Sequence, residues 1–369
     1  MSCIRARSIR EIPAAEWDGL AATDALVGRG WLGALEESGI AGLRPHYVLT
    51  RAAAGLGAAA CLETTTSEDG LLSGRFLLGP LTPLGRMLGV SCLPALVCGP
   101  YRGQGGFLLG PARAAVLECV EALAAERRLP AVFTHVPDED EELRELLLSR
   151  GYHRTTARPV ARLDLRWDSF EGYVASLRRG ARSAVRGEIR RCRDAGVAIE
   201  PIDGVEEIGA RLHALADTHY RRLNGHGVPF GPAFLPALKA RLGTAATFWG
   251  AYRGGALFGF ALVVRAGEVA HVTHVGIAED RTSFAYFNLC YYRPIAEAIA
   301  SGTRRIWYGT LLGELKARRG CRILPTSLYY RHPVRSRHLA LAPLFLAHRA
   351  WGRRKAARVQ VRGGRAEPG

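Results

Sequence analysis

Apolar positions along the chain recur with two different periods, and the two kinds of stretch alternate from one end to the other. In residues 112–128 the apolar side chains lie three and four residues apart, which predicts a helix. Residues 131–136 form an apolar run typical of a buried strand. Residues 138–154 begin with acidic residues and have arginine near their end, and this order of charges suits the dipole of a helix. A helix is therefore predicted there. This alternation predicts mixed α/β layers rather than a helix bundle or a β-sandwich.

The predicted elements occur twice in a similar order. The first set contains strands at residues 46–52, 56–64 and 75–79, then a helix, a strand, a helix and a strand at residues 161–167. The second set contains a strand at residues 197–203, a helix at 205–223, a three-strand meander at 246–277, a helix at about 283–300, and strands at 304–309 and 321–330. No repeat of individual residues accompanies this order, so the duplication is predicted from element order alone.

The chain of 369 residues is too long for one ordinary domain and suits two. We expect four parts, which are an N-terminal lobe (1–165), a basic linking helix (166–196), a C-terminal catalytic lobe (197–335) and an apolar-then-basic tail (336–369). The tail is too short to span a bilayer. It is compatible with a packed amphipathic cap, a contact with acidic lipids or an extension of a nucleic-acid surface.

Positive charge is in large excess, with a formal net charge of +16 and a pI near 10. Arginine carries nearly all of it, because the lysines are only Lys239, Lys316 and Lys355. A codon preference explains arginine in place of lysine, but it does not explain the excess of bases over acids. The charge therefore indicates a polyanionic partner, such as a nucleic acid, a phosphorylated carrier or a membrane surface.

The basic charge is densest between the two predicted lobes. Arg178, Arg182, Arg186 and Arg190 recur at every fourth position and so share one side of a helix, and Arg179 adds to them. Arginines in this pattern can follow consecutive phosphates, which makes these five residues the candidate RNA-binding set. The alternative is a solvated basic helix that only bridges two lobes.

Eight cysteines are scattered without a CxxC pair, so we expect free thiols and neither a zinc site nor a disulfide framework. No metal and no cofactor is predicted. The N-terminus lacks an apolar signal region, and prolines and glycines interrupt the apolar stretch at residues 81–97. We therefore expect a cytoplasmic protein without stable membrane insertion.

The most specific motif lies in residues 271–325 and includes the run YGTLLGELKARRGCR, which begins at Tyr308. This region resembles the C-terminal half of the Fem-like N-acyltransferases of the GNAT superfamily. The run PYRGQGGFLLGP resembles their Pro-Tyr-Gly-x-Gly-Gly segment, with Arg102 at the position of a glycine. The resemblance covers most of residues 15–330. It implies an α/β (α+β) fold of two tandem GNAT-like lobes, each a mixed, mostly antiparallel sheet flanked by helices.

The resemblance also implies a donor and a reaction. Acyl-CoA enzymes of this superfamily carry a glycine-rich loop that presents N–H groups to a pyrophosphate. Here the segment after Gly276 contains no glycine before the next helix, and Glu279 and Asp280 would repel the pyrophosphate. Fem-like proteins instead use aminoacyl-tRNA. We therefore expect transfer of an aminoacyl group from aminoacyl-tRNA to an amine of a small metabolite or a peptide, as in a specialised metabolite or a peptidoglycan bridge.

Two alternatives stay open at this point. One is an N-acyltransferase of the same fold that depends on acyl-CoA or an acyl carrier. The other is a non-catalytic RNA-binding module with degenerate lobes, against which the Glu-x-Lys motif argues.

Four residues are candidates for catalysis. His274 lies on a predicted strand and is a possible proton acceptor, with His271 expected on the opposite face of that strand. Tyr308 is a candidate donor to the oxyanion or the leaving ribose oxygen. Glu314 is a candidate base or ammonium anchor, and Lys316 a candidate anion ligand. The alternatives are a hydrogen-bonded core histidine and an ordinary surface pair. We expect all four side chains to converge on one cleft.

A second set of residues is assigned to substrate binding. Its members are Tyr286, Asn288, Arg319, Arg322 and Tyr101. The two arginines flank Cys321 and are expected to lower the pKa of its thiol, so an acyl-cysteine intermediate is a minor alternative.

Overall fold

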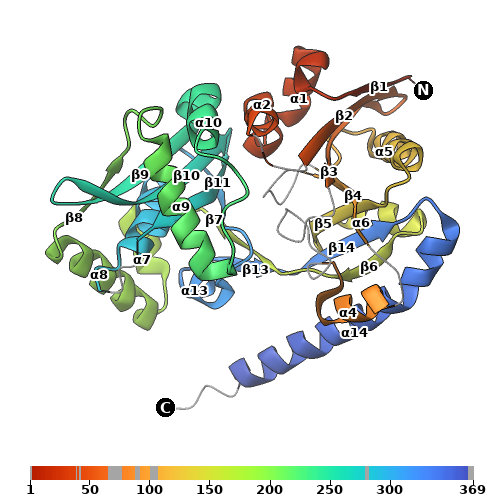
Figure 1. Ribbon diagram of the computed structural model, residues 1–369. Coiled ribbons are helices and arrows are strands. Elements are labelled where there is room, and N and C mark those ends of the chain that lie inside the picture. Colours follow the sequence, from red (N-terminus) through yellow and green to blue (C-terminus); the bar gives the residue numbers. More distant parts are fainter. Residues whose placement is uncertain are drawn as a thin grey trace.

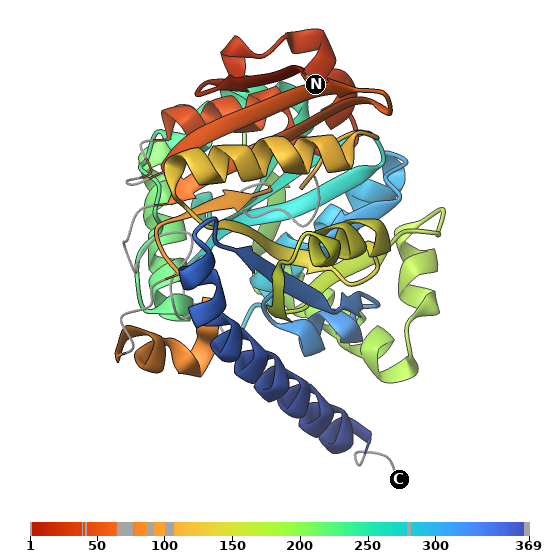
Figure 2. The same cartoon turned by 90° about the vertical axis from the view of Figure 1, so that its right-hand side faces the viewer.

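Two seven-stranded sheets organise the protein, one in each lobe (Figure 1). The computed structural model describes residues 2–38, 40, 43–64, 77–87, 92–99, 107–278 and 282–364. A long C-terminal helix runs along the first lobe and extends beyond it, as the perpendicular view in Figure 2 shows in dark blue.

The first sheet contains strands from both ends of the chain. In order across the sheet they are β1 (Ser2–Ala6), β2 (Leu43–Ala52), β3 (Gly55–Thr64), β4 (Ala95–Cys98), β5 (Ala131–Pro137), β14 (Thr326–Arg331) and β6 (His153–Thr156). Among the described strands, β4 and β5 pair in parallel and the other neighbours pair antiparallel.

The second sheet repeats this plan. In the corresponding order its strands are β8 (Val197–Pro201), β9 (Ala246–Arg253), β10 (Ala256–Ala266), β11 (Val269–Ile277), β12 (Arg305–Trp307), β7 (Val160–Asp164) and β13 (Arg322–Leu324). Here β11 and β12 form the parallel pair. The matching order and direction confirm the predicted α/β fold of two GNAT-like lobes.

The two sheets exchange one strand each, which the sequence did not predict. The strand predicted to end the first lobe is β7, and it pairs with β12 and β13 of the second sheet. The strand predicted at residues 321–330 is divided at Pro325, so β13 stays in the second sheet while β14 pairs with β5 and β6 of the first. Proline has no N–H for a ladder, so Pro325 and Pro159 suit the points where the chain changes sheets. The expected lobes 1–165 and 197–335 therefore need correction at these two strands.

Helices cover the sheets. The first lobe carries η1 (Ile9–Glu11), α1 (Ala14–Ala21), η2 (Ala25–Val27), α2 (Arg29–Glu37), η3 (Gly79–Leu81), α4 (Thr82–Met87), α5 (Arg113–Arg127) and α6 (Glu141–Ser149). The second carries α7 (Phe170–Ser176), α8 (Arg179–Asp194), α9 (Gly209–Asn224), α10 (Phe234–Leu242), η4 (Gly243–Ala245), α11 (Ala285–Phe287), the π-helical η5 (Asn288–Tyr292), α12 (Arg293–Ala300) and α13 (Gly313–Arg318). The remaining helix is α14 (Arg335–Gly364).

Two predicted elements differ from the structure. The basic stretch forms two helices rather than one, because Leu177 is extended and Arg178 is also non-helical, and together they separate α7 from α8. Of the strand predicted at residues 75–79, Leu77 and Leu78 are helical and continue into η3. Apolar runs this short do not distinguish a strand from a buried helical turn.

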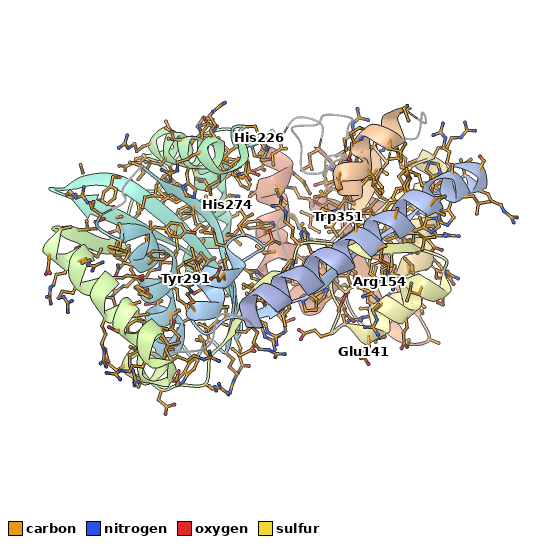
Figure 3. The ribbon with its side chains drawn as sticks, turned by 90° about the horizontal axis from the view of Figure 1, so that it is seen from below. Glu141, Arg154, His226, His274, Tyr291 and Trp351 are labelled. Atoms are coloured by element: carbon orange, nitrogen blue, oxygen red, sulfur yellow. The ribbon has the colours of Figure 1, made fainter. Side chains whose placement is uncertain are left out.

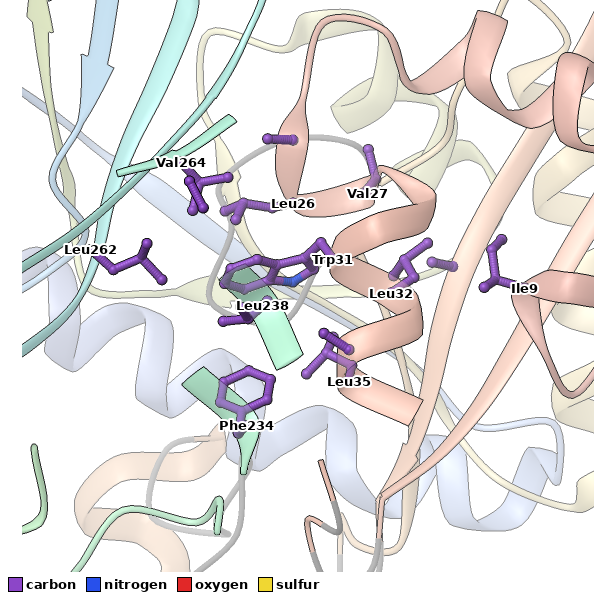
Figure 4. Packing of buried hydrophobic residues seen from close by; sticks show 14 of the residues in the cluster. Ile9, Leu26, Val27, Trp31, Leu32, Leu35, Phe234, Leu238, Leu262 and Val264 are labelled. Atoms are coloured by element: carbon purple, nitrogen blue, oxygen red, sulfur yellow. The ribbon is translucent and has the colours of Figure 1, made fainter. Parts of the chain in front are cut away.

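One hydrophobic core joins the lobes (Figure 4). Trp31 of α2 lies between Phe234 and Leu238 of α10 and the side chains of β10, Leu262 and Val264. A second core lies on the other face of the second sheet, where α7, α8, η5 and α12 pack. The second sheet is therefore buried on both faces, with the first lobe against one of them.

The helix α14 packs on the first sheet through Leu341, Leu344 and Phe345. Within the part of the chain that the structure describes, no helix has the length and apolarity needed to cross a membrane.

Candidate functional site

Strand β11 carries two histidines that both face the first lobe. Its pairing with β10 shifts between Val272 and Val275, so Thr273 and His274 together oppose a single residue. This bulge turns His274 to the same side as His271. His271 Nε2 lies 3.3 Å from Asp24 Oδ1, and the His274 ring lies 5.8 Å from that of Trp31. The prediction that the two histidines face opposite sides is therefore wrong.

His274 lies among aromatic rings in the core between the lobes. The centroid of its ring is 5.2 Å from that of Phe230 and 5.5 Å from that of Phe234, and the ring of Trp31 also packs against it. Its Nδ1 lies 3.3 Å from the hydroxyl of Thr273. These contacts favour the alternative of a core histidine.

The parallel strands β11 and β12 separate at their carboxyl ends. Their ladder covers Val269–His271 against Arg305–Trp307, although β11 continues to Ile277. Tyr308, the next residue after β12, donates its N–H to the Ala161 carbonyl at 2.9 Å and so turns towards β7. Tyr291 of η5 stacks on Tyr308, with ring centroids 4.8 Å apart. The end of β12 and the π-helical turn therefore form one aromatic cluster.

Lys316 is buried beneath this cluster. Its Nζ donates to the carbonyl oxygens of Tyr308 at 2.6 Å and Gly309 at 3.2 Å. Burial lowers the pKa of Lys316 to about 8, although the thiols of Cys321 and Cys290 act in the opposite direction. The ammonium form therefore predominates at neutral pH, close to the range in which the proton is lost.

The hydroxyl of Tyr308 is buried and has no hydrogen-bond partner among the described residues. Burial raises the pKa of Tyr308 well above its usual value, so the phenol keeps its proton. A buried hydroxyl is normally hydrogen-bonded, and one without a partner is suited to receive a ligand group. Tyr308 and Lys316 are the two predicted catalytic residues that the structure brings together.

Arg319 connects this cluster to the basic helix α8. Its Nη2 pairs with Glu188 Oε2 at 2.6 Å, and its Nε donates to the Tyr292 hydroxyl at 3.1 Å. The third nitrogen, Nη1, donates to the Leu315 carbonyl at 3.0 Å, and the guanidinium lies 3.9 Å from the Phe287 ring centroid. Because each nitrogen has a partner within the protein, these contacts favour a structural role over the predicted substrate contact.

Glu314 lies outside the cluster. Its side chain is 81% exposed and pairs with Arg318 one turn later, at 2.7 Å. Glu314 and Lys316 are two residues apart on α13 and so point to different sides of the helix. His274 is separated in another way, because it faces the first lobe while Tyr308 packs on the other face of the sheet. The expected convergence of four residues is therefore wrong for Glu314 and His274.

The other predicted substrate residues have different surroundings. Asn288 donates to the Glu188 carbonyl at 3.3 Å and the Phe284 carbonyl at 3.1 Å. Arg322 is exposed and lies 3.6 Å from an Asp164 oxygen. Tyr101 lies outside the described residues. Asn288 thus ties η5 to α8, and Arg322 remains at the surface.

Tyr286 is half-buried and stacks on His219 of α9, with ring centroids 6.2 Å apart. Burial and then the neighbouring Arg222 lower the pKa of His219 to about 4, so this histidine is neutral at physiological pH. The pair joins α9 to α11 at the carboxyl end of β11. A neutral histidine beside a half-exposed tyrosine is a polar feature that the sequence did not indicate.

The thiol of Cys321 is not activated. Burial raises its pKa to about 12, which outweighs the opposite effects of Lys316 and Arg319. The expected lowering by flanking arginines is therefore wrong, and an acyl-cysteine intermediate is disfavoured.

The predicted RNA-binding arginines lie on the outer side of α8 or, for Arg178, at its N-cap. Arg178, Arg179, Arg186 and Arg190 are exposed and Arg182 is half-buried. The opposite side buries Val185 and Cys192 in the core of the second lobe. Glu188 also points inward to Arg319, so one helix carries a basic outer surface and an acidic contact with the aromatic cluster.

Sequence reasoning did not assign Glu188, Tyr291 or Tyr292 to the site. The signal for Glu188 was available, because it is the one acid between Ala175 and Arg193. The tyrosines gave no such signal, since adjacent aromatic residues are equally typical of a core.

The model of the FemAB-like family, described as peptidoglycan biosynthesis/recognition, matches residues 110–353 of this chain. No curated protein sequence matches significantly. Several solved structures are similar across nearly the whole chain. FemX is 11% identical, covers 89% of this chain and 97% of its own, and gives a TM-score of 0.59.

The C-terminal domain of a putative lysylphosphatidylglycerol synthetase from Agrobacterium fabrum is also 11% identical, with 89% and 94% covered and a TM-score of 0.57. A tandem GNAT protein from the clavulanic acid biosynthesis pathway is 11% identical, with 90% and 98% covered and a TM-score of 0.51. At this identity the structures show the shared fold.

Proposed function

Because this chain belongs to the FemAB-like family and is an acyltransferase of the GNAT superfamily, we propose that it forms amide bonds with an aminoacyl group taken from aminoacyl-tRNA. The acceptor is an amine of a small metabolite or a peptide. The amine nitrogen attacks the ester carbonyl, the new C–N bond forms, and the C–O bond to the terminal ribose breaks. The proton lost by the amine is balanced by the proton gained by the ribose oxygen.

The observation that carries this proposal is the buried Tyr308 hydroxyl, which has no partner among the described residues, in a residue whose backbone carbonyl accepts a hydrogen bond from the Lys316 ammonium. A protonated phenol at this position can donate to the oxyanion of the tetrahedral intermediate or to the leaving ribose oxygen. Lys316 fixes the Tyr308–Gly309 backbone and adds positive charge where negative charge develops. An ester donor is already reactive, so we assign most of the rate to positioning.

The basic helix supports tRNA as the donor. Its exposed arginines can pair with phosphates, and its Glu188 carboxylate contacts the cluster around Arg319. The alternative donor, acyl-CoA, lacks support in the sequence after β11. Residues 277–288 contain no glycine, and α11 is only three residues long before the π-helical turn begins. Glu279 and Asp280 themselves lie outside the described residues.

Donor identification tests this proposal directly. RNA that co-purifies with the protein would be sequenced, and the matching tRNA would be charged and offered with a panel of amines. We expect an amide product, detected by mass spectrometry, that depends on the charged tRNA. Amide formation from acetyl-CoA, without any from charged tRNA, would replace this proposal with the acyl-CoA alternative.

A further inference from the structure

Over about three turns, the C-terminal helix α14 buries Leu341, Leu344 and Phe345 on one side and exposes apolar residues on the other. The polar residues of this stretch are the buried His348 and the half-buried Arg349. One side packs on the first sheet, while the other faces outward along the underside of the molecule (Figure 3). From residue 339 to residue 351, every exposed residue of this helix is apolar. These residues are Leu339, Ala340, Pro343, Leu346, Ala347, Ala350 and Trp351.

The exposure is large where the side chains are large. Leu339 is 57% exposed, Leu346 is 64% exposed and Trp351 is 45% exposed. Leu339 and Leu346 are two turns apart and so lie on the same side of the helix. A surface helix normally presents polar residues to water, and contiguous exposed apolar side chains mark an interaction surface.

The short helix α4 also carries exposed apolar side chains. Helix α4 lies beside α14 in Figures 1 and 3, and His348 of α14 lies directly against Gly79 of η3, the turn that precedes α4. Met87 at the end of α4 is 77% exposed, and Leu84 is also exposed. We call the exposed residues 339–351 of α14 the apolar face.

The sequence around the apolar face is strongly basic. Arg335 and Arg337 precede it, and Arg353, Arg354 and Lys355 follow it directly. No acidic residue occurs between Glu314 and Glu367 in the sequence. The charge therefore favours a polyanionic partner, and the apolar face favours a partner that accepts aliphatic side chains.

We propose that the apolar face docks on the surface of an anionic lipid bilayer. Leucine side chains would enter the boundary between headgroups and acyl chains, the tryptophan would lie at that boundary, and the flanking bases would contact acidic headgroups. RNA satisfies the charge but offers no apolar environment for Leu339 and Leu346. A second copy of this chain could cover the apolar face, but the basic residues that flank the face in each copy would repel one another. This surface is independent of the proposed donor and acceptor.

Vesicle co-sedimentation tests the docking. The 369-residue chain would be mixed with phosphatidylcholine vesicles that contain about one third phosphatidylglycerol, and with pure phosphatidylcholine vesicles. We expect binding to the anionic vesicles that weakens with added salt. Leu339→Gln with Leu346→Gln should reduce this binding at least about tenfold, because two largely exposed leucines lose their apolar contact. Leu148→Gln with Leu223→Gln, at exposed positions on α6 and α9, is the matched control and should bind as the wild type does.

Three outcomes would overturn the proposal. The first is failure of the wild-type protein to bind anionic vesicles at low salt. The second is equal binding by the Leu339/Leu346 variant and the control. The third is a wild-type dimer in light scattering that the Leu339/Leu346 variant converts to a monomer, which would assign the apolar face to a second copy. If the charged tail instead served RNA, vesicle binding would be absent and the triple variant Arg353→Gln, Arg354→Gln, Lys355→Gln would lose RNA affinity.

Discussion

Lys316 is one of three lysines in a chain whose positive charge is otherwise arginine, and its position explains the difference. Its buried ammonium group donates hydrogen bonds to two backbone carbonyl oxygens. Lysine presents a compact charge that can lose its proton when buried, whereas arginine is larger and stays charged. The sequence singled out this residue by its rarity, and the fold supplies the reason.

The titration of Lys316 gives a prediction for stability. Its pKa is about 8 in the folded protein and 10.5 ordinarily, so the unfolded chain binds a proton between these values that the folded chain does not. The free energy of unfolding of the wild type, relative to Lys316→Met, should therefore rise as the pH increases from 8 to 10.5. The full change is about 3 kcal/mol by the usual conversion. Denaturant titrations of both proteins at several pH values measure it, and a constant difference would contradict the buried ammonium.

Two buried tyrosine hydroxyls in the cluster make a matched pair. Tyr308→Phe removes a hydroxyl without a partner among the described residues, so stability should hardly change while turnover falls at least about 100-fold. Tyr292→Phe removes a hydroxyl that contacts Glu188 and Arg319, so unfolding should cost about 1–3 kcal/mol less. Thermal melts and turnover measurements on both variants check this. Equal effects on stability would show that the Tyr308 hydroxyl also makes a stabilising contact in the folded protein.

Local patterns predicted some side-chain positions and missed others. The two-residue spacing of Glu314 and Lys316 already places them on different sides of a helix, so their separation follows from the sequence. The side of the sheet on which His274 lies does not follow from the sequence, because one extra residue in a strand reverses the direction of every side chain beyond it. A bulge depends on the partner strand, which the sequence of β11 alone does not contain.

At the scale of elements, helix α8 has a different partner on each side. Its arginines face outward and its Glu188 faces the cluster, which is a pattern that a solvated bridging helix does not require. The four-residue arginine spacing predicted the exposed side correctly. It did not predict the break before Arg179, because the stretch contains no proline to mark it.

Phosphate contacts by α8 predict a change in salt dependence. Changing Arg178, Arg186 and Arg190 together to glutamine should weaken RNA binding and reduce the slope of log affinity against log salt by about two, at about 0.7 per phosphate on a single strand. Arg10→Gln with Arg51→Gln removes exposed charge from the first lobe and should leave the slope nearly unchanged. Filter binding at four salt concentrations measures the slopes. Identical slopes for wild type and the α8 variant would assign these arginines to solvent.

The exchange of β7 and β14 between the sheets shows that strands can be predicted from the sequence more readily than the sheet to which each belongs. The elements themselves were mostly predicted, since periodicity is a local property. Their assignment to a sheet is not local, because it depends on pairing between residues more than 150 positions apart. Pro159 and Pro325 mark both crossing points, but a proline in an apolar run equally indicates an edge strand.

At the scale of the whole molecule, the shared core and the exchanged strands make the two lobes one folding unit. Trp31 belongs to the first lobe and is buried against Phe234 of the second. Calorimetry should therefore show a single unfolding transition. Trp31→Ala should lower the free energy of unfolding by about 3–5 kcal/mol and shift that one transition. Leu223→Ala, at an exposed site, is the control, and two separate transitions would refute the shared core.

Tyr308 is the residue that we propose to assist transfer from a charged tRNA to an amine. Single-turnover transfer of a radiolabelled aminoacyl group tests it most directly, with wild type, Tyr308→Phe and the surface control Glu314→Gln compared on the same tRNA and amine. We expect amide formation by the wild type and by Glu314→Gln at similar rates, and a rate at least about 100-fold lower for Tyr308→Phe. Transfer by Tyr308→Phe at the wild-type rate would contradict the placement of the site at the end of β12.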